Sequence, residues 1–467
     1  MKASSAVPTA AVILAAGKGT RMGSELPKVM HRLAGFPLVG HVLYQAAQAG
    51  IDKLVVVIAP GMHQVSRYVC EMPGITSEVT VAVQEEQLGT AHAVLAAKDA
   101  LAGFEGNLLV LYGDTPLVTT ETLTRLQEVL LDDARCAVAV LGFRMEAPND
   151  YGRLILGGDG ALERIVEARD ASAVQKKVTL CNSGVFAIRG NLAWELLGQI
   201  GNDNAKGEYY LTDIVELANS AGYRANVIET ESAEVLGVNS RGELAAAEAA
   251  FQQRARRAHM DSGVTLLDPA SVYFSADTVV GPDSLIEPNV FFGPGVAIGA
   301  GTHIKAFSHI EGSVIGDGAV VGPFARLRPG TNLGEKVKIG NFVEVKKSEI
   351  EAGAKINHLS YIGDAEIGEN SNIGAGTITC NYDGFHKYRT TIGRDVFVGS
   401  NTSLVAPLTI GEGAMIAAGS VITEDIAPDA LALARTRQEQ KQDWAVGFRE
   451  RKVAEKKAAK KKKSGTD

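Results

Sequence analysis

The 467-residue sequence has few cysteines and no long apolar segment. Its four cysteines lie at least 45 residues apart, at positions 70, 136, 181 and 380, so neither a C-x-x-C redox pair nor a clustered metal site is available. No apolar run approaches the ~18 residues that a membrane-spanning helix needs, and the short apolar N-terminal stretch has no cleavage-type site. These absences predict a cytoplasmic protein with buried free thiols and no membrane partner.

The length and charge of the chain indicate several domains and a basic end. At the usual ~100 to 200 residues per domain, the chain has room for two or three domains. The formal charge is -8, but residues 449–467 hold nine Lys or Arg against three acids. A block of lysines can attract nucleic acid or anionic lipid, whereas a solvated, disordered tail is the interpretation we favour. We therefore expect no nucleic-acid partner.

The region between residues 263 and 430 lacks the period of a helix. Apolar residues instead recur at every sixth position from Phe274 to Ile422, with occasional five-residue steps and a single polar member, Thr379. This period fits neither a helix nor an alternating strand and is typical of a parallel β-helix, in which glycine often takes the corner. A β-sandwich would need turn signals every 8 to 12 residues. The period leaves the handedness open, and the general crossover rule favours right-handed connections.

The first 236 residues follow a different pattern. Short apolar runs alternate with amphipathic stretches, which predicts a mostly parallel sheet covered by helices on both faces, with ligands at the carboxyl ends of the strands. Ser240 and Glu243 form a capping-box pattern at the start of a predicted linker helix. The predicted domains are an α/β domain at 1–236, a linker helix at 237–262, a β-helix at 263–448 and the basic tail at 449–467.

A glycine-rich turn follows the first apolar run. It reads L-A-A-G-K-G-T-R-M from Leu14 to Met22, with P-K ending at Lys28. Glycines let backbone N–H groups approach phosphates closely, while Arg21 and Lys28 supply positive charge. The turn is not a dinucleotide fingerprint, because that pattern needs Gly at position 22, and no G-x-x-x-x-G-K-[ST] occurs in the chain. The whole pattern resembles the signature of sugar-phosphate nucleotidyltransferases.

This resemblance implies a nucleotide site. Asp114 ends the third apolar run, where an aspartate is a reasonable magnesium ligand, although taken alone it could be a capping or surface residue. In the family this Asp holds Mg²⁺ together with an Asn that matches Asn239. Gln84 and the run from Gln87 to Thr90 match the family's loop that reads the uracil, and Gly152, Glu167 and Asn182 match its sugar contacts. The implied contacts to UTP and the UDP-sugar are Leu14, Gly17, Lys28, Gln84, Gly89, Thr90, Asp114, Gly152, Glu167, Asn182 and Asn239.

The chemistry implied there needs no protein base. A sugar 1-phosphate has a second pKa near ~6, so its oxygen is anionic at neutral pH and can attack the α-phosphorus of a nucleoside triphosphate. The barrier is repulsion between anions. We expect Arg21 and Lys28 to be the catalytic cations, because they can neutralise the departing pyrophosphate while Mg²⁺ bridges the phosphates.

Residues that depart from the six-residue repeat form a second set of motifs. They read R-L-R-P-G, N-F-V-E-V-K, H-L-S-Y-I-G-D and N-I-G-A-G-T-I-T-C-N-Y-D-G, and the period is interrupted once, at 380–389. A loop that leaves a solenoid usually shapes a binding face. In this order the motifs resemble the acetyltransferase half of the bifunctional N-acetylglucosamine-1-phosphate uridylyltransferase/glucosamine-1-phosphate N-acetyltransferase family, over about residues 10 to 445. The resemblance implies a left-handed parallel β-helix and a homotrimer with acetyl-transfer sites between subunits.

The same resemblance implies roles for single residues. His358 is the general base, because an amine attacks a thioester only when unprotonated and an imidazole with an ordinary pKa of ~6.5 can take that proton, and Glu344 orients this site. Pro is common in the family where this chain has Arg437, which affects the adenine-end contacts. The implied ligands of glucosamine phosphate are Arg328, Lys346, Tyr361, Asn372 and Lys387, and those of acetyl-CoA are Ala375, Asn381, Tyr382, Ser400, Ala418 and Arg435.

The predicted activity is therefore double. We expect acetyl transfer from acetyl-CoA to glucosamine 1-phosphate, followed by uridylyl transfer from UTP to N-acetylglucosamine 1-phosphate, with Mg²⁺ as cofactor of the second step. One alternative is a single-activity nucleotidyltransferase with a regulatory or structural β-helix, against which the motifs from His358 to Lys387 argue. Another is a β-helix that only assembles subunits. An assay of thiol release from acetyl-CoA separates these alternatives.

Overall fold

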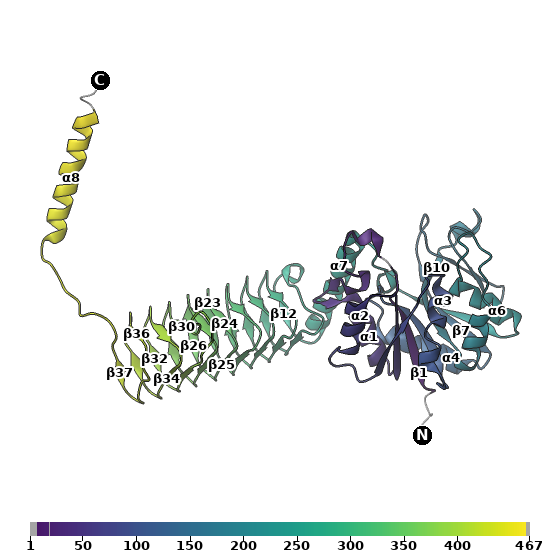
Figure 1. The fold of residues 1–467 in the computed structure, drawn as a ribbon, viewed down its shortest axis with the longest axis horizontal. Helices are drawn as coiled ribbons and strands as arrows, with labels where there is room; N and C mark the ends of the chain where they lie inside the picture. Colours follow the sequence, from purple (N-terminus) through teal and green to yellow (C-terminus); the bar gives the residue numbers. More distant parts are fainter. Residues whose placement is uncertain (1–6, 18, 464–467) are drawn as a thin grey trace. The chain divides into compact units, whose positions relative to one another are not determined.

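The computed structural model describes residues 7–17 and 19–463 (Figure 1). It divides between Gly312 and Ser313 into two compact units. The first unit holds a mixed α/β sheet, a long helix and the first coils of a β-helix, and the second unit holds further coils and a C-terminal helix. The domain limits expected at 236, 262 and 448 stay a prediction. Among the described residues, no helix is both long and apolar enough to span a membrane.

The first unit is built on a nine-stranded sheet whose main path runs β11-β7-β10-β6-β1-β4-β5. All neighbours on this path are parallel except β10, which is antiparallel to β6 and β7. The strands are β1 (Thr9–Leu14), β4 (Lys53–Ile58), β5 (Glu78–Val83), β6 (Asn107–Tyr112), β7 (Cys136–Arg144), β8 (Arg153–Leu156), β9 (Leu162–Val166), β10 (Leu180–Ile188) and β11 (Arg224–Thr230).

Helices cover both faces of this sheet, as the apolar runs predicted. Alternate residues of a strand point to opposite faces, so Val12 packs in one core and its neighbour Ile13 in the other. The core with Val12 includes residues of α3 (Thr90–Leu95), α5 (Gly190–Gly198) and α6 (Ile214–Ser220). The core with Ile13 includes residues of α1 (Leu38–Gln48), α2 (His63–Cys70) and α4 (Thr120–Asp132).

The predicted linker helix is α7 (Arg241–Asp261). Ser240 caps this helix, because the Glu243 N–H donates to the Ser240 hydroxyl (3.2 Å), and the Glu243 carboxylate reaches back to the Asn239 N–H (2.7 Å), one residue before the one that a capping box pairs. The buried side chain of Gln252 bonds to both the N–H (2.9 Å) and the carbonyl (2.7 Å) of Phe274. This pair of hydrogen bonds joins α7 to the first coil.

The β-helix consists of very short parallel strands arranged in three sheets. In the first unit these are β12 (Thr265–Leu266), β13 (Val279–Val280), β14 (Leu285–Ile286), β15 (Phe291–Phe292), β16 (Ala297–Ile298), β17 (His303–Ile304) and β18 (His309–Ile310). In the second unit one sheet contains β20 (Val320–Val321), β23 (Lys338–Asn341), β26 (Lys355–His358), β29 (Asn372–Ile373), β32 (Phe397–Val398), β35 (Met415–Ile416) and β37 (Leu431–Ala432). A second sheet contains β19 (Ser313–Ile315), β22 (Thr331–Leu333), β25 (Ser348–Ile350), β28 (Ala365–Ile367), β31 (Thr390–Ile392) and β34 (Leu408–Ile410), and a third contains β21 (Arg326–Leu327), β24 (Glu344–Lys346), β27 (Tyr361–Gly363), β30 (Ile378–Cys380), β33 (Ser403–Val405) and β36 (Val421–Ile422).

The six-residue row predicted from Phe274 to Ile422 is buried at every position. Its polar member, Thr379, is 1% exposed, and its hydroxyl accepts from the Gly363 N–H (2.8 Å) and donates to the Gly363 carbonyl (3.1 Å). The β-helix is thus confirmed, and its three sheets of short parallel strands are consistent with the left-handed coil that the resemblance implies.

A second buried row consists of hydroxyl side chains, which the apolar period did not predict. Thr331, Ser371 and Thr402 are fully buried. Their hydroxyls donate to the carbonyls of Arg328 (2.7 Å), Gly393 (2.8 Å) and Gly399 (2.7 Å), respectively. Burying a hydroxyl costs little when it is hydrogen-bonded, so these side chains fill corners of the coil without penalty.

The glycines that follow inner apolar residues are required by close approach of neighbouring coils. A Cβ on Gly393 would lie 2.7 Å from the backbone nitrogen and 2.9 Å from the Cα of Glu412, in the coil above. The φ angle of Gly393 is ordinary. The corner role expected for these residues is therefore steric here rather than a matter of left-handed backbone.

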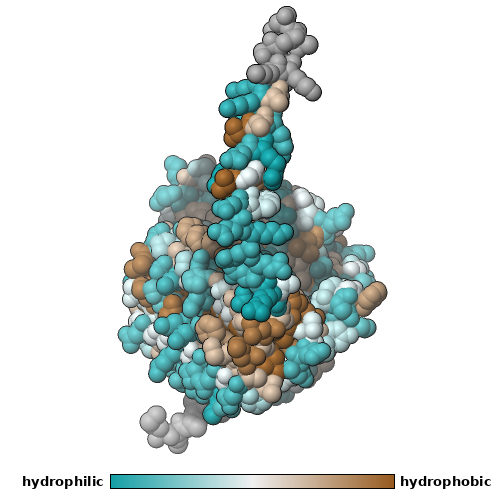
Figure 2. All heavy atoms as spheres, turned by 90° about the vertical axis from the view of Figure 1, so that its left-hand side faces the viewer, coloured by the Kyte–Doolittle hydropathy of each residue, from teal (hydrophilic) through white to brown (hydrophobic). Residues whose placement is uncertain are grey.

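The C-terminal tail and two cysteines differ from expectation. Residues expected to be disordered from 449 belong to helix α8 (Trp444–Lys463), because Ala, Glu, Lys and Arg are strong helix formers, and residues 464–467 lie outside the described residues. Its described side chains beyond 448 are all exposed, and Figure 2 shows them as largely hydrophilic. Cys136 and Cys181 are buried as expected, whereas Cys70 is exposed at the end of α2 and Cys380 is partly exposed in β30.

We predict that Gly393→Ala destabilises the β-helix. The added methyl group must displace the backbone of Glu412, and such overpacking usually costs about 1 to 3 kcal/mol. Thermal unfolding followed by circular dichroism should show a midpoint several degrees lower. The matched control is Gly158→Ala, where a Cβ meets nothing within 4 Å. Equal midpoints for the two variants would contradict the steric explanation.

Candidate functional sites

A pocket of about 410 Å³ lies at the carboxyl ends of the central strands of the mixed sheet. Strand β1 delivers Leu14, strand β5 is followed by Gln84, and strand β6 is followed by Asp114. Parallel strands end at the same edge of a sheet, which is why residues far apart in sequence meet there. The predicted nucleotide-site residues that line this pocket are Leu14, Gly17, Lys28, Gln84, Gly89, Thr90, Asp114 and Asn239.

Three of these side chains form a cation site. Lys28 pairs with the Asp114 carboxylate, and its ammonium group also donates to the Asn239 amide oxygen at 3.1 Å. The backbone N–H of Val238 donates to the Asp114 carbonyl (2.9 Å), which fixes Asn239 beside Asp114. Two oxygens from separate segments thus converge on one cation.

This donor set fits Mg²⁺. The described residues contain no cluster of three or more His, Cys, Asp or Glu that could hold a metal alone. Magnesium is usually bound by one or two protein oxygens, with water and substrate phosphates supplying the rest. Asp114 and Asn239 provide those two oxygens at the mouth of a nucleotide-sized pocket.

The loop of Gln84 to Thr90 closes over the glycine-rich turn. Gln84 donates to the Gly89 carbonyl (3.2 Å), and Gln87 donates to the Ala16 carbonyl (2.5 Å). Gly89 has a φ of 127°, and a Cβ there would lie 2.5 Å from the Tyr209 carbonyl oxygen. Only glycine is compatible with this approach.

Four predicted residues do not line the pocket. Arg21 lies in a short 3₁₀ helix, η1 (Thr20–Met22), with an exposed side chain. Gly152 and Asn182 meet each other, because the Asn182 N–H donates to the Gly152 carbonyl (2.8 Å). Glu167 accepts from the Thr212 hydroxyl (3.3 Å), and burial raises the pKa of its carboxyl group.

Tyr112 is a pocket residue near both Glu167 and Asp114, and it was not predicted from the sequence. It lines the pocket, and burial, together with the charges of Glu167 and Asp114, raises its pKa. A Cβ on Gly184 would lie 2.6 Å from its ring. Its place as the last residue of β6, two positions before Asp114, was the signal that could have identified it. Gln87, which the resemblance placed in the loop that reads the uracil, also lines the pocket, and so does Glu208, which was not assigned.

The predicted glucosamine-phosphate residues lie mainly on one sheet of the second unit. Arg328 donates to the Glu344 carboxylate at 2.8 Å, and Glu344 is in register with Tyr361 on the next strand. The ammonium group of Lys387 comes from the loop at 380–389, and its hydrogen bond and charge lower the pKa of Lys346. Arg328, Lys346 and Lys387 thus bring three positive charges together, against the two carboxylates of Glu344 and Asp364. This excess of positive charge favours binding of an anion such as a phosphate.

His358 lies at a corner of the coil, at the end of β26. Its Nδ1 is 2.8 Å from the Asn341 amide oxygen, directly below it in the preceding coil. An amide oxygen can only accept, so Nδ1 carries the proton and Nε2 is left as the basic nitrogen. Asn341 thus orients the imidazole, a role not assigned to it from the sequence.

The predicted acetyl-CoA residues form a column above His358. The Gly376 N–H donates to the His358 carbonyl (3.2 Å), the Asn401 N–H to the Ala375 carbonyl (2.7 Å), and the Gly419 N–H to the Ser400 carbonyl (2.8 Å). The same corner of successive coils therefore carries His358, Ala375, Ser400 and Ala418. A Cβ on Gly419 would lie 3.9 Å from Arg435 Cδ, so Arg435 reaches the same column.

The remaining predicted residues lie around this column. Asn381 is buried and donates to the Asp364 carboxylate (2.5 Å), while Tyr382 is exposed and its hydroxyl donates to the Gly384 carbonyl (2.5 Å). Asn372 begins β29, in a different sheet from Tyr361, and is in register with Lys355 and Phe397.

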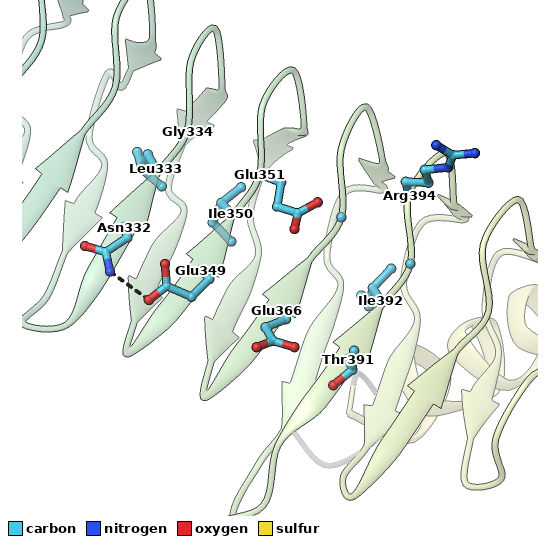
Figure 3. A pocket seen from close by; sticks show the side chains of 12 residues that line it. Asn332, Leu333, Gly334, Glu349, Ile350, Glu351, Glu366, Thr391, Ile392 and Arg394 are labelled. Atoms are coloured by element: carbon cyan, nitrogen blue, oxygen red, sulfur yellow. Dashed lines mark hydrogen bonds between the residues drawn. The ribbon is translucent and has the colours of Figure 1, made fainter.

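A separate groove of about 720 Å³ runs along β22, β25, β28 and β31 (Figure 3). Glu349 and Glu366 project from successive strands, and Asn332 donates to Glu349 at 2.7 Å. None of the residues predicted for either site lines this groove.

Comparisons with known proteins cover both halves of the chain. Residues 11–182 match the model of the MobA-like NTP transferase domain, and residues 277–312, 312–347 and 389–424 match the bacterial transferase hexapeptide model. "Bifunctional protein GlmU" of Paramagnetospirillum magneticum is 53% identical over 447 residues, or 96% of this chain and 98% of that protein. The protein of the same name from Rhizorhabdus wittichii is 56% identical over 95% of this chain and 97% of its own length. The crystal structure of a UDP-glucose pyrophosphorylase with UDP-glucose covers 53% of the chain at 18% identity, with a TM-score of 0.44.

We predict that Lys387→Met raises the pKa of Lys346. The substitution removes the neighbouring ammonium group that disfavours the charged form of Lys346. NMR titration of lysine side-chain resonances measures this shift. Lys355→Met, which removes an exposed lysine from another sheet, is the matched control. If both variants leave Lys346 titrating as in the wild type, the two ammonium groups do not share a site.

Proposed function

The chain belongs to the bifunctional GlmU family, and from this membership we propose that it catalyses two successive steps of UDP-N-acetylglucosamine synthesis. Acetyl-CoA first acetylates the amine of glucosamine 1-phosphate. UTP then transfers its uridylyl group to N-acetylglucosamine 1-phosphate, with release of pyrophosphate. The observation that carries the proposal is that each half of the chain holds its own constellation, the Lys28–Asp114–Asn239 cation site in one and the His358–Asn341 pair in the other.

For uridylyl transfer we assign binding and charge neutralisation to the protein. The phosphate oxygen of the sugar attacks the α-phosphorus, the bond to pyrophosphate breaks, and no side chain accepts a proton. Asp114 and Asn239 would hold Mg²⁺, which when bound neutralises the phosphates. Lys28 then turns from Asp114 to the triphosphate, while Gln84 and Thr90 orient the base. Arg21, which lies outside the pocket, remains a candidate for the leaving pyrophosphate.

For acetyl transfer we assign proton removal to Nε2 of His358. The amine nitrogen forms a bond to the thioester carbon, its proton passes to Nε2, and the carbon–sulfur bond breaks as that proton is returned to the departing thiolate. Arg328, Lys346 and Lys387 bind the sugar phosphate. The corner column from Ala375 to Ala418 carries the acetyl-CoA chain.

We propose that the protein is a homotrimer, because exposed apolar side chains lie next to this column. Phe324 and Phe342 stack with ring centroids 5.2 Å apart, and Leu359 follows in the next coil. They are 46%, 56% and 63% exposed, and all have positive φ angles, which are costly for bulky residues. Exposed apolar patches of this kind mark interfaces. Phe342 and Leu359 directly follow Asn341 and His358, so a second copy on this row would border the acetyl-transfer site.

We also propose that the enzyme acts in the cytoplasm. Both UTP and acetyl-CoA are cytoplasmic metabolites, and their use as co-substrates supports that location.

The trimer is tested by sedimentation. We expect a particle of three times the 49.2 kDa chain mass, and we expect Phe342→Glu to shift the protein to smaller species because it places charges in the apolar row. Val174→Glu changes an even more exposed apolar residue in the other unit and should leave the mass unchanged. A monomeric wild type at micromolar concentration would overturn the proposal.

Two substitutions should separate the activities. Asp114→Ala should abolish uridylyl transfer and leave acetyl transfer nearly intact, because it removes a metal ligand from one half only. His358→Ala should lower acetyl transfer by roughly 10²- to 10⁴-fold, the usual contribution of a positioned general base, without affecting uridylyl transfer.

Each variant serves as the control of the other. Thiol release from acetyl-CoA measures the first step, and pyrophosphate release from UTP measures the second. Parallel loss of both activities in a folded protein would contradict the assignment of two separate sites. Near-normal acetyl transfer by His358→Ala would leave Glu344 or a bound water as the candidate base.

A further inference from the structure

Two segments of the first unit meet at the cation site and are joined twice. One segment contains the 3₁₀ helix η2 (Lys28–Met30), and the other leads from Asn239 into α7. The first link is the hydrogen bond from Lys28 to Asn239. The second lies a few residues further along both segments, where the Arg241 guanidinium approaches His31 Nδ1 at 3.2 Å.

His31 is held rigidly at the end of η2. Its N–H donates to the Lys28 carbonyl (3.2 Å), and its own carbonyl accepts from the Leu38 N–H (2.9 Å). The side chain is 4% exposed. A guanidinium can only donate, so Nδ1 accepts, and the ring is neutral. Burial and the charge of Arg241 lower the pKa of His31, which agrees with that state.

The other ring nitrogen, Nε2, is buried and faces backbone rather than a charged side chain. The Leu26 carbonyl acts on this side of the ring and offsets part of the lowering of the His31 pKa by burial and by Arg241. What the histidine supplies is the acceptor for Arg241.

We propose that His31 and Arg241 are positioning residues for uridylyl transfer, which keep Asn239 in register with η2 when the metal-bound nucleotide occupies the site. The inference rests on the proposed uridylyl transfer. Neither residue lines the nucleotide pocket, so both act through the segments that carry Lys28 and Asn239.

The two links differ in what substrate binding does to them. Lys28 occupies the oxygens of Asp114 and Asn239 that fit Mg²⁺, so it must release them when the metal and triphosphate bind. The first link is then lost. The bond between His31 and Arg241 involves neither ligand and can persist, and the hydrogen bonds among Asn239, Ser240 and Glu243 transmit its position to the metal-binding amide.

The test is a double-mutant cycle with a binding readout that involves no turnover. Half-saturating Mg²⁺ for UTP binding is measured by calorimetry without sugar phosphate, for His31→Leu, Arg241→Met and the double variant. Because the lost hydrogen bond involves a charged group, each single change should raise half-saturating Mg²⁺ by roughly 10- to 100-fold. The double variant should be no worse than either single one.

Three comparisons distinguish positioning from general damage. His31→Asn keeps an acceptor near the position of Nδ1 and should restore Mg²⁺ dependence to within about threefold of wild type. Arg257→Met makes the same change further along α7, at an exposed residue outside the nucleotide pocket, and should have no effect. Acetyl transfer in the same preparations should be unchanged in every variant.

The outcomes are separable. Additive effects in the double variant, wild-type Mg²⁺ dependence in both single variants, or no rescue by His31→Asn would overturn the positioning role. If His31→Leu fails to fold, Arg241→Met alone still decides, because its side chain is exposed. A wild type that shows no Mg²⁺-dependent uridylyl transfer would instead refute the proposed function, independently of the two residues.

Discussion

Hydrogen bonding between the backbones of successive coils is the constraint on which the C-terminal half depends. It holds each strand one sheet spacing from the next, so a residue in one coil lies directly above its counterpart in the coil below. Inner positions must then stack as an apolar row, corner hydroxyls must find carbonyls, and glycine is needed where two backbones approach too closely for a Cβ. The same stacking creates the functional column, because any corner position is repeated along the axis. His358, Ala375, Ser400 and Ala418 are neighbours only for that reason.

The N-terminal site follows from a different constraint, which is the convergence of parallel strand ends at one edge of a sheet. Backbone turns and side chains from β1, β5 and β6 meet there with Asn239, which comes from the segment before α7. In this site the ammonium group of Lys28 occupies the cation position, where it contacts the Asp114 carboxylate and the Asn239 amide oxygen. When a nucleotide and its metal bind, the metal would replace Lys28 beside Asp114 and Asn239, and the phosphates would replace Asp114 as the partner of Lys28. Exchange of partners of this kind keeps the charges of the pocket paired before substrate arrives.

Much of both halves could be predicted from the sequence, because the relevant signals are local. The period of six identified every buried residue of the inner row, and the capping pattern at Ser240 and Glu243 placed the start of α7. Eight of the predicted nucleotide-site residues line one pocket, since each follows directly on a strand or belongs to a recognisable turn. The residues that contact and orient them were harder to predict from the sequence. Tyr112 and Asn341 were missed because an orienting residue is recognised by what it touches, and nothing in its own neighbourhood marks it.

By itself the sequence determined the repeat, the alternation of strands and helices, and the candidate residues that line the nucleotide pocket. These depend on periodicity and on short motifs, which are properties of neighbouring residues. Only the tertiary structure decided that Lys28 lies between Asp114 and Asn239, that Lys387 lies beside Lys346, and that His31 accepts from Arg241. Each of these contacts joins residues about 40 to 210 positions apart, and such distant pairs leave no periodic trace in a single chain. Their geometry is set by strand register and by the close packing of elements, which exist only once the chain has folded.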